Sequence, residues 1–200
     1  MKLNLATLAL CVLGFVAPAF AAVETGKPAK DFTLKDTSGK EVSLADYKGK
    51  FVVLEWYNPD CPFVKKHYDS ANMQKLQAEY TKKGVVWLSI NSSAPGKQGY
   101  YSPTEYSKIA EAKKTAPTAL LLDHDGKVGR LYNAKTTPEI FIINPEGTLI
   151  YQGGIDNKPS TDQADIATAT NYVRITLDAA ETGKPVPVGT TKPYGCSVKY

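Results

Sequence analysis

The stretch FVVLEWYNPDCPFVKKHY, residues 51–68, holds the features that best predict the fold and chemistry of this chain. Residues 51–57 are nearly all apolar, which is typical of a strand covered on both faces of a sheet. A helix is predicted to begin at Pro62, because proline is favoured in the first turn of a helix. Cys61 therefore stands between a buried strand and a helix. It is a reactive thiol, a metal ligand, a disulfide partner or an inert buried side chain.

Strands and helices alternate along the rest of the chain. Apolar runs and period-two alternation predict further strands at 31–36, 85–90 and 119–123, and a hairpin over 139–154. The predicted helices are 62–83, with a break allowed at 69–72, then 103–114 with a cap at Ser102, and a last one that begins at Ser160 or Thr161 and ends before Gly183. This order predicts an α/β fold with a mixed central sheet flanked by helices.

The two ends of the chain depart from this pattern. Residues 1–21 contain a lysine, a short apolar run and Ala19-Phe20-Ala21, which is typical of a secretory signal peptide with its cleavage site. We therefore expect an exported protein without stable membrane insertion after cleavage, periplasmic in a Gram-negative source and otherwise extracellular. Residues 22–182 are then one folded domain. Residues 183–200, rich in Pro, Gly and Thr, are predicted to form an extended tail that carries Cys196.

The composition argues against several classes of function. The formal net charge is +4, and the basic residues form no cluster with interleaved aromatic residues, so we expect no binding of nucleic acid. Cleavage of the signal leaves Cys61 and Cys196, and together with His67 and His124 they show no zinc-ligand spacing. We therefore predict no metal and no cofactor. Two cysteines in an exported protein are instead typical of a disulfide.

The predicted position of Cys61 favours a reactive thiol. The unpaired amides and the positive end of the dipole at a helix start both favour the thiolate, which is the nucleophilic form. Lys65 and Lys66 add positive charge nearby, whereas Asp60 acts in the opposite direction. We expect an open, easily ionised sulfur at this helix start.

Glu55 is the second candidate catalytic residue. It interrupts an otherwise apolar strand six residues before Cys61. A carboxylate in a strand covered on both faces is unfavourable unless it is partnered or protonated. Transfer of a proton to or from the Cys61 thiol would explain its presence. The alternative is a glutamate that faces a solvated gap and has no role.

Two longer segments carry a resemblance to a known family. Residues 26–62, GKPAKDFTLKDTSGKEVSLADYKGKFVVLEWYNPDCP, resemble the N-terminal half of redoxin domains. These form the alkyl hydroperoxide reductase and thiol-specific antioxidant group of the thioredoxin superfamily. Residues 136–157, TTPEIFIINPEGTLIYQGGIDN, are similar to the later half of such domains. The most similar branch is that of exported, peroxiredoxin-like thioredoxin family proteins. The resemblance implies a thioredoxin-like fold for nearly the whole mature chain.

The resemblance also implies roles for individual residues. Cys61 matches the first cysteine of the thioredoxin C-x-x-C motif, and Val64 stands where the second would be. Glu55 matches the buried acid of thioredoxins. Thr137 and Pro138 match the X-Pro pair whose proline is cis in that fold. The backbone beside this proline is implied to bind the substrate chain.

The chain departs from the peroxiredoxin pattern. Peroxiredoxins carry a Pro-x-x-x-Thr-x-x-Cys arrangement and an arginine that polarises the peroxide, and their peroxidatic cysteine aligns with Val64. Counted back from Cys61, Leu54 and Asn58 stand where the proline and the threonine would be. These departures argue against peroxidase chemistry by that mechanism.

A lone thiol that attacks a disulfide stays trapped as a mixed disulfide until a second thiol releases it. Cys196 is the only candidate in the mature chain, and an extended tail gains about 3.3 Å per residue, enough to cross a small domain. We therefore predict that Cys196 docks near Cys61 and cycles with it. A permanent Cys61–Cys196 disulfide that only braces the fold is the alternative.

The sequence thus predicts an exported thiol–disulfide oxidoreductase with Cys61, Cys196 and Glu55 as catalytic residues. Thr137 and Pro138 are the predicted substrate-binding residues. The partners would be a protein or small-molecule thiol or disulfide and an electron donor that the sequence does not identify. Two alternatives stay open: a peroxiredoxin-like hydroperoxide reductase at Cys61, and a redox-inert binding module that keeps the fold and a structural disulfide.

Overall fold

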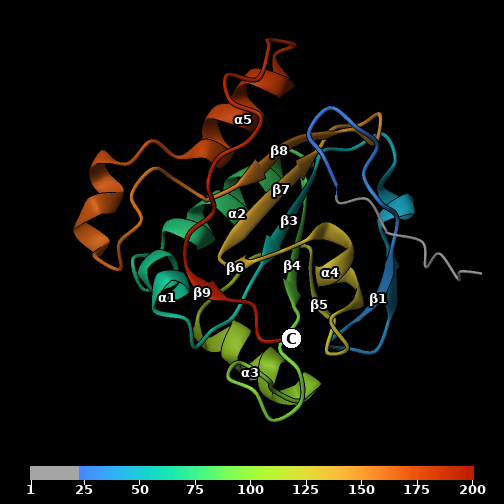
Figure 1. The fold of residues 1–200 in the computed structure, drawn as a ribbon, viewed down its shortest axis with the longest axis vertical. Helices are drawn as coiled ribbons and strands as arrows, with labels where there is room; N and C mark the ends of the chain where they lie inside the picture. The colour runs from blue at the N-terminus through green and yellow to red at the C-terminus, as the bar shows by residue number, and fades with distance from the viewer. Residues whose placement is uncertain (1–22) are drawn as a thin grey trace, which may run out of the picture.

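The computed structural model describes residues 23–200, so the predicted signal peptide, residues 1–21, lies outside the described residues. A seven-stranded sheet in the order β2-β1-β5-β4-β3-β7-β8 forms the centre of the fold (Figure 1). Its parallel strands are β3 (Val52–Trp56), β4 (Val86–Asn91) and β5 (Ala119–Leu122). The antiparallel ones are β1 (Thr33–Asp36), β2 (Glu41–Ser43), β7 (Glu139–Ile143) and β8 (Leu149–Gly153). The predicted mixed α/β sheet is confirmed.

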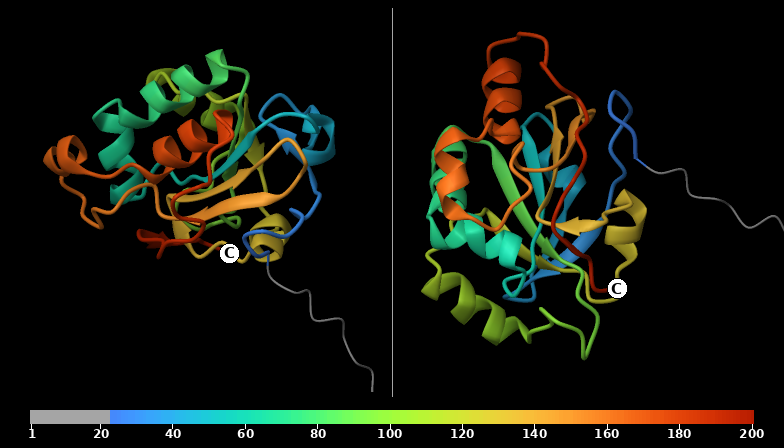
Figure 2. Two further views of the ribbon diagram at one scale, coloured as in Figure 1. Left: turned by 90° about the horizontal axis from the view of Figure 1, so that it is seen from above. Right: turned by 60° about the vertical axis from the view of Figure 1, so that its left-hand side comes forward.

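Helices cover both faces of this sheet (Figure 2). The α-helices are α1 (Pro62–Asp69), α2 (Asn72–Lys82), α3 (Pro103–Ala112), α4 (Lys127–Tyr132) and α5 (Tyr172–Glu181). Two 3-10 helices are η1 (Leu44–Tyr47) and η2 (Gln163–Thr168). Side chains of α1, α2 and α5 join the core on one face, and those of α4 join the core on the other. None of the helices within residues 23–200 is long and apolar enough to span a membrane.

Alternation along β3 explains both cores. Val52, Leu54 and Trp56 join the core on the α4 side, whereas Val53 and Tyr57 join the core under α1 and α2. All five residues of the strand are buried, as expected for a central strand covered on both faces. The strand therefore ends between two packed layers, and its carboxyl end leads directly into α1.

Several predicted boundaries are confirmed by local contacts. The helix predicted over 62–83 is interrupted between α1 and α2, where Ala71 has a φ of 58°. Ser102 caps α3 through a capping box in which its hydroxyl accepts from the Glu105 amide. The hairpin of β7 and β8 is also confirmed.

The prediction for the last helix is wrong. Instead of one helix from Ser160 or Thr161, the chain forms η2, capped by Asp162, and then α5, capped by Asn171. The Asn171 side chain accepts from the Arg174 amide at 3.0 Å and so starts a new helix. The sequence prediction also missed β2 and α4. α4 has six residues with a glycine among them, and its first amides are held by the buried Asp123.

Candidate active site

Cys61 lies beyond the carboxyl end of β3 and is the N-cap residue of α1, with Pro62 opening the helix. Its predicted place between a buried strand and a helix is therefore confirmed. The expectation of an open sulfur is wrong, because Cys61 is 0% exposed. Thr137 and the C-terminal tail lie against the thiol and cover it. A reagent must therefore displace part of this cover to reach the sulfur.

Thr137 and Pro138 border the sulfur from a separate segment. The Thr137–Pro138 peptide bond is cis, as the family resemblance implied. The Cys61 thiol donates a hydrogen bond to the Thr137 carbonyl oxygen over 3.0 Å. The Thr137 hydroxyl is buried and has no hydrogen-bond partner within residues 23–200. Thr137, one of the two residues predicted to bind substrate, is thus in direct contact with the predicted nucleophile.

The tail brings Cys196 to the same place. β6 (Thr136–Thr137) pairs with β9 (Cys196–Ser197) in an antiparallel two-stranded sheet, with Cys196 opposite Thr137. The backbone groups expected to hold a substrate chain are therefore occupied by the protein's own tail. Gly195 makes this approach possible, because its φ is 137° and a Cβ there would overlap the Thr137 carbonyl.

The contacts around Cys61 favour its ionised form. Burial raises the pKa of the thiol, but hydrogen-bonding interactions from Cys196, Thr137 and the Cys196 and Val64 amides outweigh it, and the pKa is lowered. The Val64 amide belongs to the first turn of α1, although Cys61 makes no full side-chain capping hydrogen bond. Lys65 and Lys66, expected to add to this effect, are not among its largest causes.

The pKa of Cys196 moves in the opposite direction. Burial and the neighbouring Cys61 raise it to about 11, and Lys199 lowers it slightly. In the dithiol form, Cys61 is therefore the sulfur that ionises and Cys196 is the one that keeps its proton. This asymmetry gives the two cysteines different chemical properties before any substrate arrives.

Glu55 is fully buried in the core under α1 and α2. Its carboxylate accepts hydrogen bonds from four donors, namely Tyr68 at 2.7 Å, Trp87 at 2.8 Å, Ser89 at 2.9 Å and Gln77 at 3.1 Å. Burial raises its pKa, and these hydrogen bonds act in the opposite direction. Cys61 is not among its hydrogen-bond partners, so the proton transfer predicted for Glu55 has no direct contact to support it.

Residues 25–152 match the sequence model of the AhpC/TSA family, which is more than half of the chain. The chain belongs to the AhpC/TSA family.

Individual relatives refine this assignment. This AhpC/TSA protein is 30% identical to the thiol-disulfide oxidoreductase ResA of Bacillus subtilis (strain 168), over 70% of this chain and 76% of that protein. It is 33% identical to the selenocysteine-containing peroxiredoxin PrxU of Peptoclostridium acidaminophilum, over 64% and 66% of the two chains. The crystal structure of an uncharacterized conserved protein from Geobacillus kaustophilus superimposes with a TM-score of 0.73 at 31% identity, covering 88% of this chain and 92% of that one. The AhpC/TSA chain is therefore an oxidoreductase with a thioredoxin-like fold.

One residue near the site that the sequence prediction missed is Glu139. Glu139 follows the cis proline, and its buried carboxylate accepts from the Lys135 and Thr136 amides at 2.7 and 2.9 Å. It therefore fixes the segment that leads to Thr137. Like Glu55, it is an acidic residue in an apolar strand, and that signal would have identified it. Residues 23–200 contain no group of three or more side chains that could hold a metal ion.

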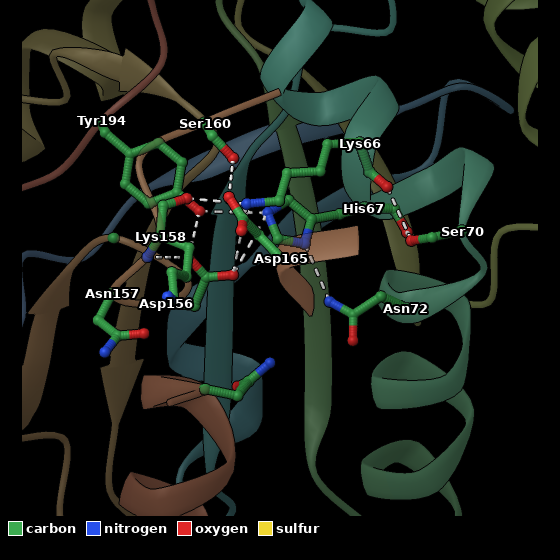
Figure 3. Close-up of polar contacts among 12 residues, drawn as sticks. Lys66, His67, Ser70, Asn72, Asp156, Asn157, Lys158, Ser160, Asp165 and Tyr194 are labelled. Atoms are coloured by element: carbon green, nitrogen blue, oxygen red, sulfur yellow. Dashed lines mark hydrogen bonds and ion pairs between the residues drawn. The ribbon is translucent and has the colours of Figure 1, made fainter. Parts of the chain in front are cut away.

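A buried polar cluster lies beside α1 (Figure 3). Lys66 is 1% exposed, and its ammonium lies 4.0 Å from the carboxylate of Asp156. His67 lies 3.9 Å from the same carboxylate, and its Nδ1 is 2.9 Å from the amide nitrogen of Asn72. The Tyr194 hydroxyl donates to Asp156 over 2.6 Å. The cluster joins α1, the segment after β8 and the C-terminal tail.

The state of His67 predicts a loss of stability in acid. Burial lowers its pKa from 6.5 to about 4, although Asp156 acts in the opposite direction and Lys66 adds to the lowering. Between these pH values His67 binds a proton in the unfolded chain and not in the folded chain. The contribution of neutral His67 to the free energy of unfolding is therefore fully present above pH 6.5 and is lost as the pH falls towards 4. The loss from His67 amounts to about 3 kcal/mol.

Urea unfolding at pH 7, 5.5 and 4 measures this loss. We expect His67→Gln to be less pH-dependent than the wild type over this range. The difference between the two proteins isolates His67, since His124 and the carboxylates titrate in both. An identical pH dependence in wild type and His67→Gln would contradict the prediction.

Proposed function

We propose that this protein is an exported thiol–disulfide oxidoreductase in which Cys61 is the nucleophile and Cys196 is the resolving thiol. The observation that carries the proposal is the pairing of β9 with β6, which brings Cys196 opposite Thr137 and against Cys61. The activity printed in the name of the Bacillus subtilis relative, thiol-disulfide oxidoreductase, supports the reaction class. Export rests on the predicted signal peptide.

The reaction follows from thiol–disulfide exchange. The Cys61 thiolate attacks one sulfur of a substrate disulfide, forms a mixed disulfide and releases the other substrate sulfur as a thiolate. Cys196, once deprotonated, then attacks the Cys61 sulfur, forms the Cys61–Cys196 disulfide and releases the second substrate thiol. The substrate gains two electrons and the protein loses two. A dithiol donor that restores the two thiols completes the cycle.

The first step removes one cause of the raised pKa of Cys196, which favours its attack in the second step. Part of that rise comes from the neighbouring Cys61, which carries negative charge when ionised. The first step converts the Cys61 thiolate into a neutral disulfide sulfur, so this contribution disappears when Cys196 must attack. Lys199 continues to favour the Cys196 thiolate. The order of the two attacks is thus set by the charge on Cys61.

Reduction of a hydroperoxide at Cys61 is a second candidate, and the cover over the sulfur favours it, because a small oxidant fits such a site better than a protein disulfide. The 33% identity to a peroxiredoxin is consistent with this candidate. The chain's two arginines, however, are engaged elsewhere: Arg130 lies over the Tyr200 ring and Arg174 pairs with Glu79. Rapid formation of sulfenic acid at Cys61 by hydrogen peroxide would favour the peroxidase.

Replacing Cys196 by serine tests the proposed function. We expect Cys196→Ser, mixed with oxidised glutathione, to accumulate a glutathione adduct at Cys61, because no second thiol can release it. The wild type should form the intramolecular disulfide and hold little adduct. Peptide mass spectrometry distinguishes the two products. A Cys196→Ser variant that turns over disulfides as fast as the wild type would exclude the resolving role.

A further inference from the structure

The segment that follows α5 crosses the molecule as a strap. This C-terminal strap, residues 189–200, first lies along β8, where the Gln152 amide donates to the Gly189 carbonyl and the Thr191 amide donates to the Gln152 carbonyl, both at 3.0 Å. At its far end, the Lys199 carbonyl accepts from the Ala94 amide at 2.8 Å. The strap is the red segment of Figures 1 and 2, and Cys196 lies between its two ends.

Tyr194 fixes the middle of this strap. Its hydroxyl donates to Asp156 over 2.6 Å, and its ring packs edge-on against Phe63 of α1 with centroids 5.9 Å apart. In Figure 3 the ring reaches from the strap into the polar cluster beside α1. Through Tyr194 the strap is hydrogen-bonded to the buried carboxylate of Asp156.

The hydrogen bonds of the cluster run in one direction. Asn72 donates to His67 Nδ1, so the proton of the neutral ring lies on Nε2, which donates to the Tyr194 oxygen at 3.3 Å. The tyrosine proton is then directed at Asp156. The tautomer follows from the asparagine orientation that satisfies this network. Tyr194 both accepts and donates, and it completes the chain from α1 to Asp156.

Asp156 keeps other partners when Tyr194 is absent. The Lys158 amide donates to the same carboxylate oxygen at 2.8 Å, and the Lys66 ammonium lies 4.0 Å from the other oxygen. A buried carboxylate with these partners is tolerated without the tyrosine. Loss of the Tyr194 hydrogen bond therefore leaves Asp156 with two other partners.

We propose that Tyr194 is a positioning residue whose hydrogen bond to Asp156 holds the C-terminal strap over Cys61 and presents Cys196 for the resolving step. The inference rests on the proposed function of the two cysteines. Only Gly195 separates Tyr194 from Cys196, so fixing one residue fixes the backbone of the other to within about 7 Å. By holding the strap over Cys61, Tyr194 slows the access of reagents to the Cys61 sulfur and accelerates the attack of Cys196 on it.

The aromatic disulfide 5,5′-dithiobis(2-nitrobenzoate) separates the two effects. Attack by the Cys61 thiolate breaks the reagent disulfide, forms a mixed disulfide and releases one nitrothiobenzoate. Attack by Cys196 on Cys61 then forms the protein disulfide and releases the second. Both releases are followed in stopped flow by absorbance. In Tyr194→Phe we expect a first release about tenfold faster and a second release several-fold slower, since one hydrogen bond to a charged group is lost.

Tyr80→Phe is the matched control. Tyr80 also donates to a carboxylate, that of Asp178 at 2.8 Å, but it lies between α2 and α5 and not on the strap. We expect Tyr80→Phe to leave both releases at wild-type rates. Equal effects of the two variants, or no change in Tyr194→Phe, would overturn the proposal. A wild type that releases only one nitrothiobenzoate would instead refute the resolving role of Cys196. Failure of the proposed function is thus distinguished from failure of the proposal for Tyr194.

Discussion

Replacing Gly195 by alanine is expected to raise the rate at which iodoacetamide alkylates Cys61 by about 100-fold. Gly195 has a φ of 137°, and a Cβ there would overlap the Thr137 carbonyl. Strain of this kind amounts to about 3 kcal/mol, which corresponds to a hundredfold larger population of the undocked strap. Since Cys61 is fully buried, its alkylation reports that population.

The measurement is best made at pH 9 with peptide mapping of the alkylated site. Undocking also removes the Cys196 interactions that lower the pKa of Cys61, and alkaline pH reduces the effect of that change on the rate. Gly183→Ala is the control, because Gly183 has a φ of 70° but a Cβ there would meet no atom within 4 Å. Alkylation of Gly195→Ala at the wild-type rate would show that the strap does not cover Cys61.

Replacing Glu55 by alanine is expected to lower the free energy of unfolding by about 3–5 kcal/mol, because each buried donor left without an acceptor costs about 1–3 kcal/mol. The change leaves Tyr68, Trp87, Ser89 and Gln77 without their common acceptor. Glu55→Gln should be much milder, because its amide oxygen can still accept from two of these groups and its nitrogen can donate to the Tyr68 hydroxyl. Guanidinium unfolding of the three proteins measures both effects.

The same glutamine variant tests the catalytic role predicted for Glu55. Because Cys61 is not among the groups that contact the carboxylate, we expect the pH profile of Cys61 alkylation to be the same in Glu55→Gln and in the wild type. A profile displaced in the variant would restore the role of Glu55 as a proton acceptor for the thiol.

The features predictable from the sequence are those set by neighbours along the chain. The apolar run of β3 followed by Pro62 locates Cys61 at a helix start, and the Ser102 capping box locates α3. The last helix shows the limit of such reasoning. Its predicted start competes with Asn171, which caps a shorter helix, and nothing in the periodicity distinguishes the two starts.

The features that could not be predicted depend on contacts between distant segments. Lys66 has the sequence context of a surface lysine, but Asp156 and the Lys158 carbonyl stabilise it in the interior. Gly195 has the context of a flexible tail, yet its missing side chain is what allows the strap to approach Thr137. The sequence showed that Cys196 could reach Cys61, but not that the strap would cover the nucleophile.

The reduction potential of the Cys61–Cys196 pair distinguishes two thiols that cycle from a structural disulfide. We propose that Cys61 and Cys196 alternate between the dithiol and the disulfide, and that the strap that carries Cys196 can open. Equilibration of the protein in glutathione and dithiothreitol buffers, followed by alkylation and mass spectrometry, gives the oxidised fraction. We expect a potential between about −270 and −120 mV, the range of thiol–disulfide oxidoreductases. A value well below about −300 mV would identify a structural disulfide and contradict the proposed cycling of Cys61 and Cys196.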